Sequence, residues 1–357
     1  MRKVAVTGLG AVLTNPTDDI LGGWNSTSRG AGLFTAIPPQ KQELVELIRD
    51  ESQGLFNSFS PNQSARRSVV WSVSKNHFGS FESWIGGGDR RFFSDSDAHF
   101  LAQTFGLGGQ MMCPVAACAS GCHAIILGAR LIEAGQSDVV LCGASEPPQH
   151  PLILAAYRNM GALSPSGVMR PFDRRRDGFV PASGSGFTIL ESLDHALARG
   201  AKIHALLSGY SMRSDASHIT SMCPTGDSIV RAVDEALSKA NHSSIGYINA
   251  HGTATRANDE TEARALNRLF EAKVPVSSTK ALTGHLLGAS GALEAVLSVV
   301  VLKQNVLPST LGLEEPEFDL DLVREERCVE VESVLSLNYG FGGHIGAVVF
   351  DKFKAHR

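Results

Sequence analysis

Residues 113–122 of the chain read Cys-Pro-Val-Ala-Ala-Cys-Ala-Ser-Gly-Cys, and this stretch decides how the fold is interpreted. It has the character of a buried strand end that turns through small residues into a helix. The helical pattern continues over residues 124–135 and ends at Gly135. Cys118 would then lie at a helix N-terminus, where free N–H groups and the helix dipole stabilise a thiolate. The sequence therefore offers Cys118 as a candidate nucleophile, with a structural core cysteine as the alternative.

Two histidine motifs follow far downstream. The first is Ala-His-Gly-Thr-Ala-Thr at residues 250–255, and the second is Lys-Ala-Leu-Thr-Gly-His at residues 280–285. His251 and His285 both come where a predicted strand ends beside glycine, and functional side chains gather at such loops. Lys280 and Glu294 could form a buried pair that polarises neighbouring groups. A structural role is the alternative for each histidine taken alone.

A glycine-rich motif completes the set. Residues 337–344 read Leu-Asn-Tyr-Gly-Phe-Gly-Gly-His, with Phe341 between glycines. Glycine lets backbone amides approach a reacting oxygen, as an oxyanion hole requires, and a plain hairpin is the alternative. Other motifs are weaker: Gly8-Leu-Gly10 lacks the third glycine of a dinucleotide site. Cys113, Cys118, Cys122 and His123 lack the spacing of a structural zinc site.

Strands alternate with helical patterns along the chain, which predicts an α/β fold with a covered sheet. With 357 residues, of which 43% are hydrophobic and 19% charged, the chain can bury a large core. Short apolar segments predict strands that begin at Val4, Asp138, Phe187, Tyr247 and Val348. We expect two units, residues 1–199 and 200–357. Residues 35–65 and 80–95 are predicted to be irregular loops.

Composition argues against several classes of protein. The formal net charge of -4 disfavours a nucleic-acid binder held by phosphate contacts. The basic clusters Arg66-Arg67, Arg90-Arg91 and Arg174-Arg175-Arg176 are interpreted as solvated faces, with a docking patch for an acidic partner as the alternative. We find no leader peptide and no apolar run of about 18 residues, so we expect no membrane span. The six cysteines lack the spacing of a disulfide scaffold, which favours a reducing cytosol.

The motifs around Cys118, His251, His285 and Phe341 together resemble those of the β-ketoacyl-acyl-carrier-protein synthases, the condensing enzymes of fatty-acid and polyketide assembly. Residues 170–180, Arg-Pro-Phe-Asp-Arg-Arg-Arg-Asp-Gly-Phe-Val, resemble a further stretch typical of that family. The resemblance implies a thiolase-like fold, with two similar halves in a five-layered αβαβα arrangement, built as a dimer. The nucleophile would lie in the N-terminal half and both histidines in the C-terminal half.

The resemblance also implies roles for single residues. Cys118 looks like the acyl-accepting nucleophile, and His251 and His285 look like the decarboxylation histidines. Lys280 matches a catalytic-site lysine that Glu294 supports. The residues expected to bind substrate, the threonines at the phosphopantetheine arm and the aromatic loop as a gate of the acyl pocket, are Thr253, Thr255, Phe341 and Gly342.

The implied reaction is a decarboxylative Claisen condensation. An acyl group on the cysteine would be joined to malonyl-acyl carrier protein, giving 3-oxoacyl-acyl carrier protein, while the histidine N–H groups stabilise the enolate. The resemblance implies no metal or redox cofactor, because the phosphopantetheine arm of the carrier delivers the substrates. The implied partners are acyl carrier protein and a second ketosynthase-like subunit, in a homodimer or a heterodimer.

The chain departs from the family pattern at Ser183, Leu337 and Ile345, and the part that precedes Cys118 is shorter than usual. These departures leave two alternatives open. One is a partner subunit like the chain-length factors, which would pair with an active condensing enzyme. The other is an acyltransferase that uses the same fold without decarboxylation.

Overall fold

The computed structural model of the protein describes residues 2–13, 34–36, 41–56, 61–64, 66–75, 85–86 and 97–354. The strands are β1 Val4–Leu13, β2 Phe34–Ala36, β3 Arg67–Val73, β4 Met111–Met112, β5 Val139–Glu146, β6 Gly184–Ser192, β7 Ala205–Ser214, β8 Tyr247–Asn249, β9 Val276–Ser277, β10 Val306–Leu307, β11 Arg327–Cys328, β12 Ser333–Gly340 and β13 His344–Asp351. The α-helices are α2 Lys41–Glu51, α3 Pro61–Ser64, α5 Asp97–Phe105, α6 Ser120–Glu133, α7 Pro151–Asn159, α8 Leu193–Ala198, α9 Asp227–Ala240, α10 Arg256–Phe270, α11 Lys280–Thr283 and α12 Ser290–Gln304. Two short 3-10 turns, η2 Ala117–Ala119 and η3 Leu287–Ala289, lead directly into α6 and α12.

Most of the strands belong to one mixed sheet whose two halves repeat a pattern. Its order is β4-β3-β5-β6-β1-β7-β13-β12-β8-β9, and β2 pairs with β1. In one half, β1, β6 and β5 are antiparallel neighbours and β5 is parallel to β3. In the other half, β7, β13 and β12 are antiparallel neighbours and β12 is parallel to β8. A short pairing of β1 with β7 joins the halves, and the boundary predicted at residue 199 falls between α8 and β7.

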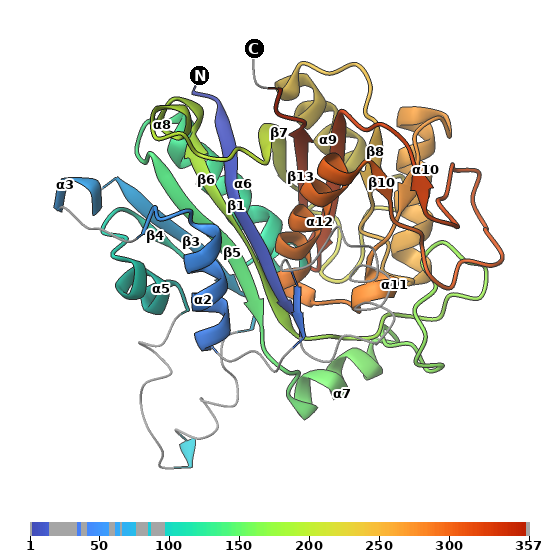
Figure 1. Ribbon diagram of the computed structural model, residues 1–357. Coiled ribbons are helices and arrows are strands. Elements are labelled where there is room, and N and C mark those ends of the chain that lie inside the picture. The colour runs from blue at the N-terminus through green and yellow to red at the C-terminus, as the bar shows by residue number, and fades with distance from the viewer. Residues whose placement is uncertain are drawn as a thin grey trace.

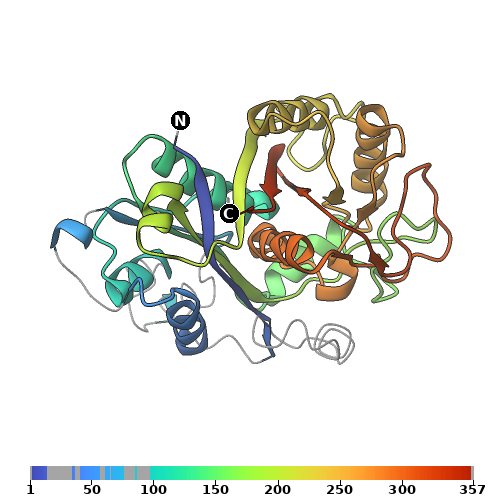
Figure 2. The same ribbon diagram turned by 45° about the horizontal axis from the view of Figure 1, so that its top comes forward.

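Three buried apolar clusters show how helices cover the sheet. The central cluster surrounds α6 and α12, and Figures 1 and 2 place these helices between the two halves of the sheet. The outer clusters lie under α2 and α5 on one side and under α9 and α10 on the other. Along β5, Val140 and Cys142 face the central cluster while Val139 and Leu141 face an outer one, as alternate residues of a strand must. The layers confirm the predicted αβαβα arrangement.

The two central helices cross in close contact because each carries a glycine at the crossing. A Cβ atom at Gly121 of α6 would lie 2.6 Å from the backbone nitrogen of Ala292, and one at Gly291 of α12 would lie 2.6 Å from that of Cys122. Ordinary side chains cannot occupy these spaces. The crossing therefore brings the first turns of α6 and α12 together, and with them the segments that carry Cys118 and His285.

Helix α12 is enclosed on all sides. Every residue from Ser290 to Leu302 is buried. Within the described part of the chain, one helical segment, Leu287–Gln304, is long and apolar enough to cross a membrane, and 89% of it is buried inside the protein. A helix between two sheet layers needs apolar residues all round, so its central position accounts for its composition.

The structure corrects several predictions. The region predicted as an irregular loop, residues 35–65, contains the eleven-residue helix α2, whose residues Leu44, Val45 and Ile48 are buried. Of the other predicted loop, residues 80–95, only Ile85 and Gly86 are described. The predicted strands are confirmed, although β1 and β6 extend beyond the predicted segments.

Two of the basic clusters each contain one buried arginine, while Arg174 and Arg175 are exposed as the interpretation expects. Arg67 is only 7% exposed and Arg176 only 2%. Arg66, the neighbour of Arg67 in the sequence, donates a hydrogen bond to Asp138 at 2.6 Å. The pair Arg90-Arg91 lies outside the described residues. The interpretation from charge alone is wrong for Arg67 and Arg176, because charge in the sequence does not show which side chains the fold buries.

Substituting Gly121 by alanine tests the crossing. The added Cβ would meet backbone of α12, which cannot move aside cheaply, so we expect the free energy of unfolding to fall by about 2–3 kcal/mol. Chemical denaturation of the variant and the wild type measures this loss. Arg130→Ala, at an exposed position of the same helix, is the control and should lower stability by less than about 1 kcal/mol, the value of its cation–π contact with Tyr210. An equally small change for Gly121→Ala would contradict the close crossing.

Candidate functional site

Cys118 lies in the turn η2 that leads into α6. Its side chain is 6% exposed. The end of β12 packs against this turn at Gly340, where a Cβ atom would lie 2.3 Å from the carbonyl oxygen of Ala116 and 3.1 Å from the nitrogen of Cys118. Glycine at this position therefore lets the backbone just before Phe341 approach the backbone of Cys118. This is the approach that a shared oxyanion hole requires.

His251 follows β8 and is held through its backbone. The N–H groups of His251 and Gly252 donate to the two carboxylate oxygens of Glu262, each at 2.8 Å. Glu262 lies on α10 and is fully buried, and this burial raises its pKa to about 7. Gly252 has a positive φ of 38°, and a Cβ atom there would lie 2.5 Å from the side chain of Ser278. The position of the histidine is thus set by α10 and by a turn that requires glycine.

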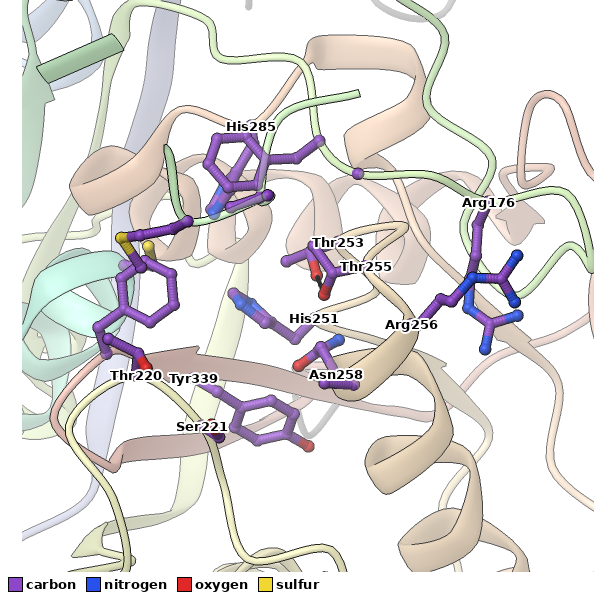
Figure 3. Close-up of a pocket in the computed structure, with 18 of the residues that line it drawn as sticks. Arg176, Thr220, Ser221, His251, Thr253, Thr255, Arg256, Asn258, His285 and Tyr339 are labelled. Atoms are coloured by element: carbon purple, nitrogen blue, oxygen red, sulfur yellow. Dashed lines mark hydrogen bonds between the residues drawn. The ribbon is translucent and has the colours of Figure 1, made fainter. Parts of the chain in front are cut away.

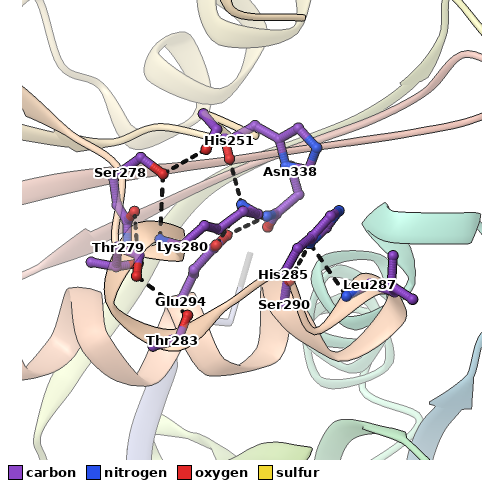
Figure 4. A network of polar contacts seen from close by, with 12 residues as sticks. His251, Ser278, Thr279, Lys280, Thr283, His285, Leu287, Ser290, Glu294 and Asn338 are labelled. Atoms are coloured by element: carbon purple, nitrogen blue, oxygen red, sulfur yellow. Dashed lines mark hydrogen bonds and ion pairs between the residues drawn. The ribbon is translucent and has the colours of Figure 1, made fainter. Parts of the chain in front are cut away.

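A buried ion pair lies behind the histidines. The Nζ atom of Lys280 donates to the carbonyl oxygen of His251 and to Oε1 of Glu294, at 2.5 Å in each case. Asn338 of β12 donates to the second carboxylate oxygen of Glu294, as Figure 4 shows. The structure therefore contains the predicted Lys280–Glu294 pair. Neither side chain lines the cavity described below.

The ring of His285 is oriented by the start of α12. The hydroxyl of Ser290 lies 2.9 Å from Nδ1, and the N–H of Leu287 donates to Nδ1 at 3.3 Å; Figure 4 shows these contacts. Because a backbone N–H can only donate, Nδ1 is the acceptor, and the neutral ring carries its proton on Nε2.

Both histidines are neutral at physiological pH. Burial lowers the pKa of His285 well below its ordinary value, and the charges of Lys280 and Lys75 lower it further. Burial, followed by the charge of Lys280, does the same to the pKa of His251. A neutral imidazole has one N–H donor, so each ring can donate one hydrogen bond.

One cavity of about 700 Å³ contains the nucleophile candidate and both histidines. The ring centroids of His251 and His285 lie 5.6 Å apart. The ring of Phe179 packs edge-on against that of His285, with the centroids 5.0 Å apart, and the ring centroids of Tyr339 and His251 are 5.1 Å apart. Cys118 lines the same cavity. The fold therefore brings together residues from the two halves of the chain that the sequence separates by more than a hundred positions.

Polar side chains continue the cavity away from Cys118. Thr253 and Thr255 line it, with their hydroxyl oxygens 2.9 Å apart. Figure 3 shows Arg176 and Arg256 beyond these threonines, on the side away from Thr220. The cavity thus runs from the sulfur and the histidines past hydroxyl groups to cationic side chains. This order suits an elongated ligand with an anionic outer end.

The aromatic loop contributes one of its two predicted residues to the cavity. Phe341 lines the cavity, and its ring lies 6.3 Å from that of Tyr157, which in turn packs on Phe179 at 5.4 Å. Gly342 does not line the cavity, and its N–H donates to the carbonyl oxygen of Ile219 at 2.7 Å.

Two effects act in opposite directions on the Cys118 thiol. The N-terminus of α6 favours the thiolate. Burial favours the thiol and raises the pKa of Cys118 to about 11; the charge of Lys75 opposes this increase and that of Glu146 adds to it. At neutral pH the resting side chain is therefore a thiol, and a helix terminus alone does not make it a thiolate.

The segment 170–180 holds the outer part of the cavity in place. The guanidinium of Arg176 pairs with Glu317 and lies 4.9 Å from the ring of Phe318. Asp173 is fully buried and accepts hydrogen bonds from the N–H groups of residues 314 and 315. These contacts explain how Asp173 and Arg176 can be buried within a run of charged residues.

Sequence reasoning assigned no role to Glu262, Ser290 or Asn338. Glu262 lies eleven residues after His251 on the next helix, and that spacing was the only available signal. Asn338 and Glu294 are 44 residues apart, so no local pattern links them. Leu337 and Ile345, where the chain departs from the family pattern, are fully buried in an outer apolar cluster. In the described residues no group of three or more His, Cys, Asp or Glu side chains could hold a metal ion.

Comparison with known proteins agrees with this geometry. The N-terminal domain model of the β-ketoacyl synthases matches residues 91–196, and the C-terminal domain model matches residues 204–314. A 3-oxoacyl-[acyl-carrier-protein] synthase 2 from Synechocystis is 44% identical over 266 residues. That match covers 71% of this chain and 64% of the relative. The chain thus matches less than two thirds of the relative's length.

Solved structures show the same relationship. A type II polyketide synthase ketosynthase, in complex with its acyl-carrier protein, has a TM-score of 0.85 at 26% identity, covering 99% of this chain and 100% of that chain. The ishigamide ketosynthase/chain length factor has a TM-score of 0.83 at 25% identity, with 99% and 100% covered. With both domain models matched and the layers and strand order in place, the chain belongs to the β-ketoacyl synthase family and has its thiolase-like fold.

Proposed function

We propose that the protein is a condensing enzyme that joins an acyl group held on Cys118 to a malonyl unit carried by acyl carrier protein, with loss of carbon dioxide. The observation that carries this proposal is the single cavity lined by Cys118, His251 and His285. A nucleophile and two neutral hydrogen-bond donors around one space are what both half-reactions require. The Synechocystis relative, a 3-oxoacyl-[acyl-carrier-protein] synthase 2, supports the same reaction.

In the first half-reaction the sulfur of Cys118 attacks the carbonyl carbon of an acyl thioester. The new carbon–sulfur bond forms as the bond to the carrier sulfur breaks, and the carrier thiol leaves with the proton that Cys118 loses. The backbone N–H groups of Cys118 and Phe341 would hold the oxyanion, which the close approach at Gly340 supports. The product is an acyl group stored on the enzyme.

In the second half-reaction a malonyl thioester loses carbon dioxide, and the electrons of the broken bond form an enolate. The N–H groups of neutral His251 and His285 would donate to the enolate oxygen. The enolate carbon then attacks the acyl group on Cys118, whose thiolate leaves and regains a proton. Lys280 acts through its charge, because a cation beside both rings opposes their protonation. It is a positioning residue in this scheme.

The outer cavity would hold the carrier's phosphopantetheine arm. Thr253 and Thr255 offer hydroxyl groups to its amides, and Arg256 lies where an anionic group would follow. No metal or redox cofactor is required by either half-reaction. We also propose a reducing compartment such as the cytosol, because Cys118 must remain a free thiol to accept the acyl group.

The partners that we propose are acyl carrier protein and a second ketosynthase-like subunit. β4 is the edge strand of the N-terminal half of the sheet. Along this edge Met111 is 49% and Val115 62% exposed, and Cys113 between them is also exposed. An apolar sheet edge that leads straight to Cys118 suits pairing with another chain. A second copy of this chain would complete the edge in a homodimer, and a chain-length-factor-like chain would complete it in a heterodimer.

Substitution of single residues separates the two half-reactions. Cys118→Ala should abolish acylation by a labelled acyl-carrier thioester, since no other group replaces the sulfur. His285→Ala should still be acylated but should release carbon dioxide from malonyl carrier at least about 100-fold more slowly, because one oxyanion donor is lost. Intact-protein mass spectrometry and carbon dioxide release measure these outcomes. Cys328→Ala, at an exposed cysteine away from the cavity, is the control and should retain both activities. Normal condensation by the Cys118→Ala protein would contradict the proposal.

The raised pKa of Cys118, about 11, predicts how fast the free enzyme reacts with iodoacetamide at different pH values. The reactive thiolate is a small fraction below the pKa, and that fraction grows about tenfold for each unit of pH. The alkylation rate should therefore rise by about tenfold per unit between pH 7 and 9. A rate that is already constant above pH 7 would show instead that the helix terminus outweighs burial.

The edge of β4 predicts the oligomeric state. A double variant with Met111→Lys and Val115→Lys should be monomeric where the wild type is a dimer, because burying two unpaired ammonium groups in an interface costs free energy. Sedimentation velocity measures the molar mass. Leu197→Lys, at another exposed apolar position, should leave the dimer intact. A monomeric wild type that dimerises only with a related subunit would favour the heterodimer, and a doubly charged variant that stays dimeric would exclude this edge as the interface.

A further inference from the structure

A second ion pair, between Lys75 and Glu146, lies beside the apolar cluster that contains Cys118. Lys75 follows β3, Glu146 ends β5, and their side chains meet at 2.7 Å from Nζ to Oε1. Lys75 is 21% exposed and Glu146 only 1%. Burying charges costs free energy unless they are paired and hydrogen-bonded. A charged pair close to the nucleophile therefore suggests a function beyond stability.

Glu146 is occupied by donors from three parts of the chain. Its Oε2 accepts from the hydroxyl of Ser74 at 2.6 Å and from the N–H of Gly288 in η3 at 3.0 Å. Its Oε1 accepts from Gln149 at 3.0 Å as well as from Lys75. The carboxylate is therefore satisfied and anchored, and it holds the ammonium group of Lys75 in one place.

The ammonium group of Lys75 has one N–H donor that no described residue accepts. An ammonium has three N–H groups. Lys75 directs one to Glu146 and one to the hydroxyl of Ser74 at 3.0 Å. Its third has no acceptor among the residues that the structure describes. An oxygen atom of a bound ligand could accept this hydrogen bond.

Lys75 lies beside the buried apolar cluster that contains Cys118, and it does not line the cavity of about 700 Å³. Its Nζ atom lies 5.8 Å from the ring centroid of Tyr157. Tyr157 in turn packs with Cys118, Phe179 and Leu287 in one buried cluster. The charge of Lys75 also lowers the pKa of Cys118 against the effect of burial. The apolar surroundings of the nucleophile therefore end at a cation.

We propose that Lys75 donates a hydrogen bond to an oxygen atom on the acyl group bound to Cys118, so that the enzyme prefers oxygen-bearing acyl chains, with keto or hydroxyl groups, over saturated chains of equal length. This inference rests on the proposed function, since it concerns the acyl group that Cys118 carries. A saturated chain would cover the ammonium and leave its donor without a partner, and a site with a buried polar group discriminates against ligands that cannot pair with it. Glu146, saturated by its own donors, serves only to fix the lysine.

The test measures the rate at which Cys118 is acylated by N-acetylcysteamine thioesters of hexanoate, 3-oxohexanoate and 5-oxohexanoate. In each case the acyl carbon moves from one sulfur to the other, and N-acetylcysteamine leaves with the proton. Each thioester is tested in a separate reaction, because the two oxohexanoyl groups have the same mass, and intact-protein mass spectrometry follows the mass that each adds to the protein. In the wild type at least one oxo-acyl group should be transferred about tenfold faster than hexanoyl.

The variants assign the preference to Lys75. Because removing the lysine alone would leave Glu146 as an unpaired buried charge, Lys75→Met is combined with Glu146→Gln, and Glu146→Gln alone is compared with it. The double variant should lose the preference, by about tenfold. Glu146→Gln should retain most of it, because the amide oxygen can still accept a hydrogen bond from Lys75. Lys273→Met is the control. It changes an exposed lysine outside the site and should show the same preference as the wild type.

Each outcome decides between the proposals. Equal rates for hexanoyl and both oxo-acyl groups in the wild type would overturn the role of Lys75 while leaving the proposed function intact, and this comparison does not depend on how the variants fold. A preference that persists in the folded double variant would overturn it as well. Failure of all three thioesters to acylate Cys118 would overturn the proposed function together with this inference.

Discussion

The close crossing of α6 and α12 is the constraint on which the site depends. At Gly121 and Gly291 each helix approaches the backbone of the other, with no side chain between them. Cys118 precedes the first glycine by three residues, and His285 precedes the second by six. The two reacting groups therefore share one volume because both helices begin at the crossing. The other catalytic candidate, His251, reaches the same volume from β8, which lies in the half of the sheet on the far side of α12.

Charge is held behind the reacting groups. Lys280 is fully buried and tied to Glu294 and to the carbonyl of His251, so its charge acts on both histidines without contacting the space between them. The rings stay neutral, and neutral rings can donate to an enolate oxygen. Glu262 fixes the backbone of His251 by accepting a hydrogen bond from its N–H group. A buried ion pair is weak evidence for stability, and here its value lies in the protonation states that it maintains.

The sequence predicted the strands and the helix after Cys118 because these depend on neighbours along the chain. Helix α2 was missed because its apolar face is short and flanked by turn-forming residues, and packing against β1 supplies what local preference does not. The burial of Arg176 was missed for a related reason. Its partner Glu317 is 141 residues away, and a run of basic residues contains no sign of such a partner.

By itself the sequence determined the family, five of the strands, the helix after Cys118, and the identity of Cys118, His251 and His285 as candidates, because short motifs carry this information. Only the tertiary structure decided the protonation state of these residues, since burial and charge depend on groups from both halves of the chain. It alone also decided that Lys75 and Glu146 meet beside Cys118, because β3, β5 and η3 are brought together only by the sheet and by the helices that cross over it.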